Sequence, residues 1–278
     1  MVSESPIPRT ERPAIADFLA QRLVGPVALD VWTQQESDLV RTDRDPCTFC
    51  EQVTTAARQF ASLHPALSLT RYDLDRHADR AREARIERAP VTVIRGRGHE
   101  LRIVGLWSGV LFPAFMEAVV YASSGAPPLQ ASTIEKLAQI DEYLDEDLEV
   151  ELLMAPYDPQ SATTLRLAAA FAMVMRRVRV EAIELSEFPL LAEARMVAEL
   201  PVVTIGGGRR FTGGWAEEDF AEQLRRSAAG ETESVIRDRI LTSPFLTIDQ
   251  AQAIVTGETP PPDQQQPPVS PGGLVLPR

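Results

Sequence analysis

Short apolar runs alternate with helical patterns along most of the chain. A strand is expected over 26–34, where β-branched and aromatic residues are frequent. Residues 47–64 carry apolar side chains at the spacing of an amphipathic helix, at Val53, Ala56, Ala57, Phe60 and Leu63. The pattern then predicts a strand over 67–75, a charged helix over 75–88, strands over 90–95 and 100–105, and an apolar helix over 110–122. This β-α-β-α-β-β-α order predicts an α/β fold.

The same order recurs in the second half. A helical pattern over 132–144 resembles the one over 14–24. After it we expect strands over 148–156, 178–186, 201–207 and 209–213, and helices over 161–177, 188–199 and 216–226. The segments Gly105-Leu106-Trp107 and Gly213-Gly214-Trp215 are 108 positions apart. The chain therefore contains an internal repeat of about 108 residues.

When the two halves are aligned by this repeat, the two cysteines of the first half correspond to other residue types in the second. The offset of 108 places Cys47 against Ala155 and Cys50 against Asp158. Pro90 pairs with Pro201 at an offset of 111, which requires a three-residue insertion. We expect four regions, in the order of a flexible segment 1–12, a first unit 13–127, a second unit 128–227 and a tail 228–278. The tail is proline-rich over 259–273, so it is expected to be mostly disordered with possible short helices.

Composition excludes several functional classes. The net charge is −12 and the isoelectric point is about 4.8, so nucleic acids and anionic membranes would repel the chain. No apolar run approaches the roughly 20 residues that span a bilayer, and the first residues lack the features of a signal peptide. Two cysteines in 278 residues do not make a secreted disulfide scaffold. A cytoplasmic location is expected.

Lysine chemistry is confined to one position. Lys136 is the only lysine, so a phosphate-binding, Schiff-base or general-base lysine would have to be this residue. It lies in an amphipathic helical pattern with no glycine loop before it. We interpret it as a solvated charge on a helix.

The candidate chemistry lies in the hexapeptide of residues 45–50, which reads DPCTFC and contains both cysteines. Two thiols at this spacing can form a redox pair, half of a metal site or two inert buried groups. A structural zinc site needs four ligands, and the three histidines of the chain are not paired at ligand spacing. No metal is expected. Inert thiols are disfavoured because Cys47 lies at a strand-to-helix junction.

That junction favours redox chemistry. A helix beginning at about Cys47 would present its unpaired N–H groups and positive dipole end to the sulfur, which stabilises the thiolate. We expect Cys47 to be the exposed nucleophile and Cys50, one turn inward, to be the buried resolving thiol. Three nearby acidic residues oppose the thiolate and two arginines support it, at Asp43, Asp45, Glu51, Arg41 and Arg44.

The motif, the proline some forty residues later and the repeat together carry a resemblance. From about Pro13 to Ser227 the chain resembles the thioredoxin superfamily, and most closely the two-unit, glutaredoxin-like protein disulfide oxidoreductases. The resemblance implies tandem thioredoxin-like units, each with a central mixed β-sheet flanked by helices, and no bound cofactor. It also implies a cis bond before Pro90, close to the cysteine pair. Substrate is expected to bind at four residues, namely Ala89, Pro90, Thr48 and Phe49.

The chain also departs from the family. Ala155 and Asp158 stand where a second cysteine pair would lie, in the sequence MAPYDPQ, although Pro201 is kept. The second unit is therefore expected to have lost its redox activity. About a dozen extra residues precede Cys47, which predicts an enlarged loop beside the active site.

Asp30 has two interpretations. It stands two residues before Trp32, which matches the thioredoxin pattern in which a buried carboxylate relays a proton to the inner cysteine. The alternative is a polar residue at the edge of the fold. Trp107 and Trp215 are interpreted as packing groups at the start of the last helix of each unit.

Two functional hypotheses remain open. The first is a thiol–disulfide oxidoreductase that exchanges electrons with protein or small-molecule disulfides through Cys47 and Cys50, with a separate reductase or oxidant as partner. The second is a thioredoxin-fold interaction protein that binds a partner peptide, with redox chemistry secondary. The apolar end of the tail, 274–278, favours the second hypothesis as a candidate for docking on another protein, and the alternative is a disordered end with no role.

Overall fold

The computed structural model describes residues 6–34 and 47–231, all of which belong to one compact unit that ends at Val235. Of the expected flexible start over 1–12, residues 6–12 are described, and Ile7 among them is buried with its N–H bonded to the Gln59 side chain. Residues 1–5, the enlarged loop before Cys47 and most of the expected tail lie outside the described residues. So do the charged residues just before Cys47.

The first repeat runs from the helix that starts at Arg12 to the helix that ends at Ser124. Its elements are α1 Arg12–Arg22, β1 Val27–Thr33, α2 Cys50–Ala61, β2 Leu67–Asp73, α3 Ala78–Glu83, β3 Val91–Gly96, β4 His99–Val104 and α4 Leu111–Ser124. The second repeat follows the same order, with one short 3₁₀ helix added. Its elements are α5 Ala131–Tyr143, β5 Leu148–Met154, α6 Pro159–Ala172, β6 Val178–Glu184, η1 Leu185–Glu187, α7 Pro189–Ala194, β7 Val202–Ile205, β8 Arg209–Thr212 and α8 Glu217–Ala228. The structure confirms the duplication.

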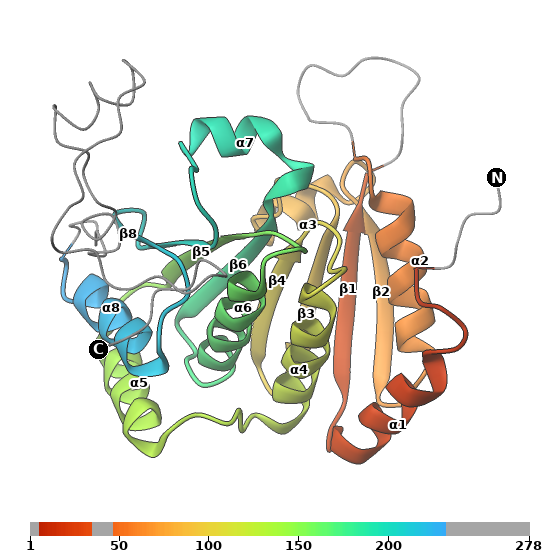
Figure 1. Ribbon diagram of the computed structural model, residues 1–278, viewed down its shortest axis with the longest axis horizontal. Coiled ribbons are helices and arrows are strands. Elements are labelled where there is room, and N and C mark those ends of the chain that lie inside the picture. The colour runs from red at the N-terminus through yellow and green to blue at the C-terminus, as the bar shows by residue number, and fades with distance from the viewer. Residues whose placement is uncertain (1–5, 35–46, 232–278) are drawn as a thin grey trace, which may run out of the picture. The chain divides into compact units, whose positions relative to one another are not determined.

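The two repeats share one eight-stranded sheet, in the order β2-β1-β3-β4-β6-β5-β7-β8 (Figure 1). Each repeat contributes the same arrangement, with one parallel pair and two antiparallel pairs. They join where β4 pairs in parallel with β6, with Arg102 opposite Glu181. The sequence predicted a sheet in each unit, and the structure shows that these sheets are continuous.

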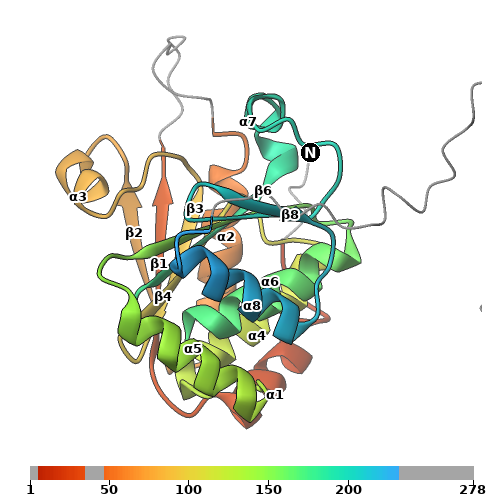
Figure 2. The same ribbon diagram turned by 90° about the vertical axis from the view of Figure 1, so that its left-hand side faces the viewer.

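Helices cover the two faces of the sheet unequally (Figure 2). One large apolar cluster joins the strands to α1, α2, α4, α5, α6 and α8. The smaller cluster lies on the other face with α3, η1 and α7. Alternation along β1 divides its side chains between the two, because Leu29 lies in the large cluster and Trp32 in the small one. The cysteines belong to the small cluster.

Two helices are shorter than the sequence predicted. The patterns over 75–88 and 188–199 form only the six residues of α3 and of α7. Each helix is followed by an arginine or methionine with positive φ, Arg85 at 52° and Met196 at 49°. The next N–H then bonds back five residues, from Ile86 to Ala81 and from Val197 to Ala192. This is the geometry of a Schellman C-cap, which stops both helices at corresponding places.

Candidate active site

The cysteine pair lies at the start of α2 and forms a disulfide, with the two Cα atoms 5.5 Å apart. The first helical residue is Cys50, since the first main-chain bond of the helix runs from the Val53 N–H to the Phe49 carbonyl. The expectation that the helix begins at about Cys47 is therefore wrong by three residues. Phe49 has φ −112° and ψ 12°, outside the helical range, so the turn before it stays non-helical.

Exposure does not distinguish the two cysteine residues as expected. Cys47 is 6% exposed and Cys50 is 7% exposed, so the prediction of an exposed Cys47 and a buried Cys50 is wrong for the disulfide form. Their contacts do differ, because the Gln34 N–H donates a hydrogen bond to the Cys50 sulfur at 3.2 Å. Between them, Thr48 is exposed and Phe49 is half-buried.

Pro90 and Pro201 occupy corresponding positions, each before the third strand of its repeat. The Ala89-Pro90 and Leu200-Pro201 bonds are both cis, which confirms the cis bond expected before Pro90. The Pro90 carbonyl accepts the Gly105 N–H at 2.8 Å, and the Pro201 carbonyl accepts the Gly213 N–H at the same distance. Ala89 is buried in the same apolar cluster as the cysteines.

Asp30 is buried rather than at an edge. It lies in the middle of β1 on the face that carries Trp32, and only 5% of it is exposed. Its carboxylate forms an ion pair of 2.7 Å with Arg95 on the neighbouring strand β3. The described contacts therefore assign this carboxylate a cationic partner, and the proton-relay role stays a prediction.

The second repeat has a helix cap where the first has a thiol. Asp158 is the N-cap of α6, and its carboxylate accepts the N–H groups of Gln160 at 3.2 Å and Ser161 at 2.7 Å. The Ser161 hydroxyl also donates to Asp158, and it accepts the N–H of the fully buried Ala155. A carboxylate at this position serves the orphan N–H groups of the helix start.

First-repeat main chain lies directly against this former site. The Pro156 carbonyl accepts the Val110 N–H at 2.9 Å. Gly109 makes the approach possible, because a Cβ there would lie 2.3 Å from the Pro156 oxygen. The turn that corresponds to Thr48 and Phe49 is thus used for contact between the repeats, although Tyr157 remains exposed.

A second junction lies beside the intact site and was not predicted. Glu187 of η1 accepts the Leu106 N–H at 2.5 Å across the boundary between the repeats. Gly105 permits this contact, because its φ is +94° and a Cβ would lie 2.8 Å from the Glu184 Cβ. Burial raises the pKa of Glu187 to about 7; the Leu106 N–H lowers it, and the Glu184 carboxylate raises it further. Nothing in the local sequence distinguishes Glu187 from a solvated helix charge.

A charged groove of about 270 Å³ lies over the join between β4 and β6. Its lining includes Arg88, next to Ala89, and Glu181, opposite Arg102 in the sheet. Burial raises the pKa of the Glu181 carboxyl, and the charges of Arg88 and Arg102 oppose the shift. Arg85 and Glu149 form an ion pair of 3.1 Å between the repeats at this groove.

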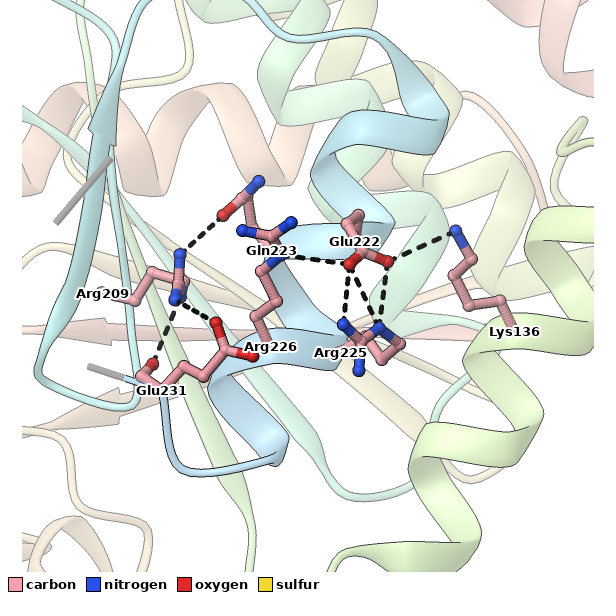
Figure 3. A network of polar contacts seen from close by, with 7 residues as sticks. All are labelled: Lys136, Arg209, Glu222, Gln223, Arg225, Arg226 and Glu231. Carbon is pink, nitrogen blue, oxygen red and sulfur yellow. Dashed lines mark hydrogen bonds and ion pairs between the residues drawn. The ribbon is translucent and has the colours of Figure 1, made fainter. Parts of the chain in front are cut away.

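Lys136 lies far along the chain from the cysteines, in an ion-pair network between α5 and α8 (Figure 3). It is 3.7 Å from Glu222, which also accepts hydrogen bonds from Arg225 and Arg226. The hydrogen bond from Arg225 is the main reason that the pKa of Glu222 falls to about 2. This arrangement is that of a surface charge, as the sequence indicated.

The described residues, 6–34 and 47–231, show neither a metal-binding cluster nor a membrane-spanning helix. They contain no group of three or more histidine, cysteine or acidic side chains arranged to hold a metal ion. No helix among them is both long and apolar enough to cross a membrane.

Several solved structures share this fold. A protein disulfide oxidoreductase from Aeropyrum pernix K1 superposes with a TM-score of 0.67 at 23% identity, covering 82% of this chain and 95% of that one. The NTD_N/C domain of alkylhydroperoxide reductase AhpF from Enterococcus faecalis superposes with a TM-score of 0.67 at 18% identity, covering 78% and 99%. No family model matches the sequence, and neither does any curated protein. These likenesses establish the tandem thioredoxin-like fold that the sequence predicted.

Proposed function

We propose that the chain is a thiol–disulfide oxidoreductase that works through Cys47 and Cys50. The observation that carries the proposal is the Cys47–Cys50 disulfide at the start of α2, in a tandem thioredoxin-like fold. Ala89, which precedes the cis bond to Pro90, packs in the same apolar cluster as both cysteines. Protein or small-molecule disulfides are the proposed substrates, with a separate dithiol or disulfide as the electron partner.

The proposed exchange has two steps. The Cys47 thiolate attacks one substrate sulfur, so that a Cys47–substrate disulfide forms, the substrate S–S bond breaks and the leaving thiolate takes a proton. The Cys50 thiolate then attacks the Cys47 sulfur, which closes the Cys47–Cys50 disulfide and releases the second substrate thiol. The substrate gains two electrons and two protons, and the reverse sequence oxidises a dithiol.

The hydrogen bond from Gln34 supports this order of attack. A main-chain N–H directed at the Cys50 sulfur stabilises negative charge on that atom. Cys50 is therefore the better leaving thiolate when an incoming thiolate opens the disulfide, which leaves Cys47 as the sulfur joined to the substrate.

Substrate is proposed to bind across Ala89, Pro90, Thr48 and Phe49. Within the described residues, the N–H and carbonyl of Ala89 make no hydrogen bond, so both are available to an extended peptide. Thr48 offers an exposed side chain beside Cys47. Asp30 is proposed to receive or return the proton of Cys50, in competition with its ion pair to Arg95.

One observation favours an interaction protein as the alternative. Five exposed large apolar side chains belong to the second repeat, where no thiol is present, namely Ile134, Tyr143, Tyr157, Leu190 and Met196. They offer contacts to a partner independently of redox chemistry. We also propose a cytoplasmic location, a boundary between the two units at about residue 127 and docking of the tail on another protein.

The reduction potential of the full chain tests the proposal against this alternative. Equilibration with glutathione should place the Cys47–Cys50 couple between about −270 and −120 mV, the span of thiol–disulfide enzymes. The reduced chain should also turn over a peptide that contains one disulfide. A potential below about −300 mV, as for structural disulfides, together with no turnover would favour the interaction protein.

A further inference from the structure

We propose that Glu187, in the repeat without cysteines, is a positioning residue for the active site of the other repeat. Its carboxylate holds the Leu106 N–H and thereby fixes the main-chain edge that presents Ala89 and Pro90 to a peptide disulfide. This inference rests on the proposed function and adds a specificity for extended peptides over small disulfides.

A chain of contacts links Glu187 to the site. The carboxylate accepts the Leu106 N–H, and the preceding residue, Gly105, donates its N–H to the Pro90 carbonyl at 2.8 Å. Pro90 follows Ala89, whose side chain packs in one cluster with both cysteines. A displacement of Leu106 would therefore also displace Ala89 and Pro90, because only Gly105 and its hydrogen bond to Pro90 lie between them.

The second repeat satisfies the corresponding N–H in a different way. Gly214 corresponds to Leu106 at the offset of 108, and its N–H donates to the Gln160 side chain at 2.7 Å. Gln160 belongs to the same repeat, and its counterpart in the first repeat is Gln52. Gln52 is exposed, and its side chain makes no hydrogen bond within the described residues. The first repeat thus relies on a carboxylate from its neighbour where the second uses its own amide.

The residues beside Glu187 tie it to the active-site cluster. Leu185 and Phe188, from the same short segment, are buried in the cluster that contains Cys47 and Cys50. Glu184 is the other charged group that faces Glu187, and its carboxylate is bonded to the N–H and hydroxyl of Ser186. The loop packed against them, Gly105-Leu106, carries no charged side chain.

Titration distinguishes this carboxylate from an amide. The pKa of Glu187 is raised to about 7, mainly by burial, so its charge changes near neutral pH. The ionised form is the stronger acceptor for the Leu106 N–H. A glutamine would accept the same N–H at every pH, as Gln160 does for Gly214.

Two substrates test the positioning role at pH 8. We expect Glu187→Ala to raise KM for a peptide with one intramolecular disulfide about tenfold, the size of a lost charge-assisted hydrogen bond. The loss with bis(2-hydroxyethyl) disulfide should be less than twofold, because that probe needs only the Cys47 sulfur. Glu187→Gln should restore the peptide KM, and Gln52→Ala is the matched control for loss of a side chain that holds nothing. Equal losses with both probes would assign Glu187 a merely structural role and overturn the inference.

The Leu106 amide provides a readout that does not depend on activity. In ¹H–¹⁵N correlation spectra, its resonance should titrate with a midpoint near pH 7 in the wild type and not in Glu187→Gln. The Gly214 amide, bonded to Gln160, is the internal control and should not follow that titration. If Leu106 does not titrate, or if it titrates and the peptide KM is unchanged in Glu187→Ala, the inference is wrong. A wild type that exchanges no disulfide would instead overturn the proposed function itself.

Discussion

The two repeats have the same local main-chain arrangement, called the frame below, but carry very different side chains at the site. Each places a turn and a helix start after its first strand, a cis proline before its third strand and a glycine N–H on that proline's carbonyl. One frame holds the Cys47–Cys50 disulfide, and the other holds Ala155 and the Asp158 helix cap. The comparison shows that the frame does not depend on the disulfide. Redox chemistry is thus a property of the side chains placed on it.

The repeat without cysteines contacts its neighbour at two places. Its former active-site turn meets Gly109 and Val110, while Glu187 meets Leu106 at the edge of the intact site. Both contacts use main-chain groups of the first repeat. The repeat without thiols therefore holds main-chain groups of the repeat that carries them.

The largest expected effect is on turnover, which a substitution at the cysteine site should abolish and one at the corresponding site of the second repeat should not. Cys47→Ser should lower exchange with a peptide disulfide by about a thousandfold or more, because a hydroxyl cannot replace the thiolate nucleophile. Asp158→Asn, at the corresponding site of the second repeat, should leave turnover within about twofold. Steady-state rates with one peptide substrate check both variants. Substantial activity in Cys47→Ser would break the comparison.

Alanine substitutions at two glycines compare the stability cost at the contact between the repeats with the cost at an open turn. Gly109→Ala should lower the free energy of unfolding by about 2–5 kcal/mol, because its φ is +56° and the new Cβ meets the Pro156 carbonyl. Gly207→Ala has a similar φ of +71° but no atom within 4 Å, so its cost should be about 1–2 kcal/mol. Denaturant titration of the full chain measures both. Equal losses would show that the contact at Pro156 contributes little.

Removal of the helix cap should have a smaller effect. Asp158→Ala should lower the free energy of unfolding by about 1–2 kcal/mol, since two N–H groups and the Ser161 hydroxyl lose their acceptor. Asp158→Asn keeps an acceptor oxygen and should cost less. Urea titrations at pH 7 compare them. If Asp158→Ala is neutral, the carboxylate is not a cap that replaces the thiol.

The smallest effect concerns pH and the surface network of the second repeat. The pKa of Glu222 is lowered to about 2, chiefly by the hydrogen bond from Arg225. A lowered folded-state pKa gives stability that is present above the unfolded value of about 4.5 and is lost as pH falls toward 2. Because the pair is at the surface, the loss should be below about 1 kcal/mol. Unfolding of Glu222→Gln against wild type over this range should reveal it, and an identical pH dependence would contradict the assignment.

The local parts of this account could be predicted from the sequence, and the long-range parts could not. The duplication could be predicted, because hydrophobic periodicity within each short segment indicates its helix or strand. The landmarks at Trp107 and Trp215 then give the offset between the two copies. The join of β4 to β6 uses main-chain hydrogen bonds, which any residue type can make, so no side-chain signal announces it. The shortness of α3 and α7 depends on positive φ at Arg85 and Met196, which are not typical residues for that conformation.

The site shows the same division. The cysteine motif and the cis proline were visible as short patterns, whereas the similar burial of the two cysteine residues and the Arg95 partner of Asp30 depend on tertiary packing. Glu187 could not be found, because its partner is a main-chain N–H 81 residues away. A comparison of the two repeats in sequence does not reveal it either, because both have glutamine at this position, and only the structure shows that Gln160 accepts an N–H whereas the Gln52 side chain does not.

Trapping of the covalent intermediate tests the central claim most directly. Cys50→Ser and Cys47→Ser chains are each reduced, mixed with a peptide disulfide and analysed by intact-mass spectrometry. The account predicts that Cys50→Ser accumulates a disulfide between Cys47 and the peptide, whereas Cys47→Ser accumulates little. Equal trapping by both variants would contradict the assignment of Cys47 as the nucleophile, and trapping by neither would contradict the proposed thiol–disulfide exchange.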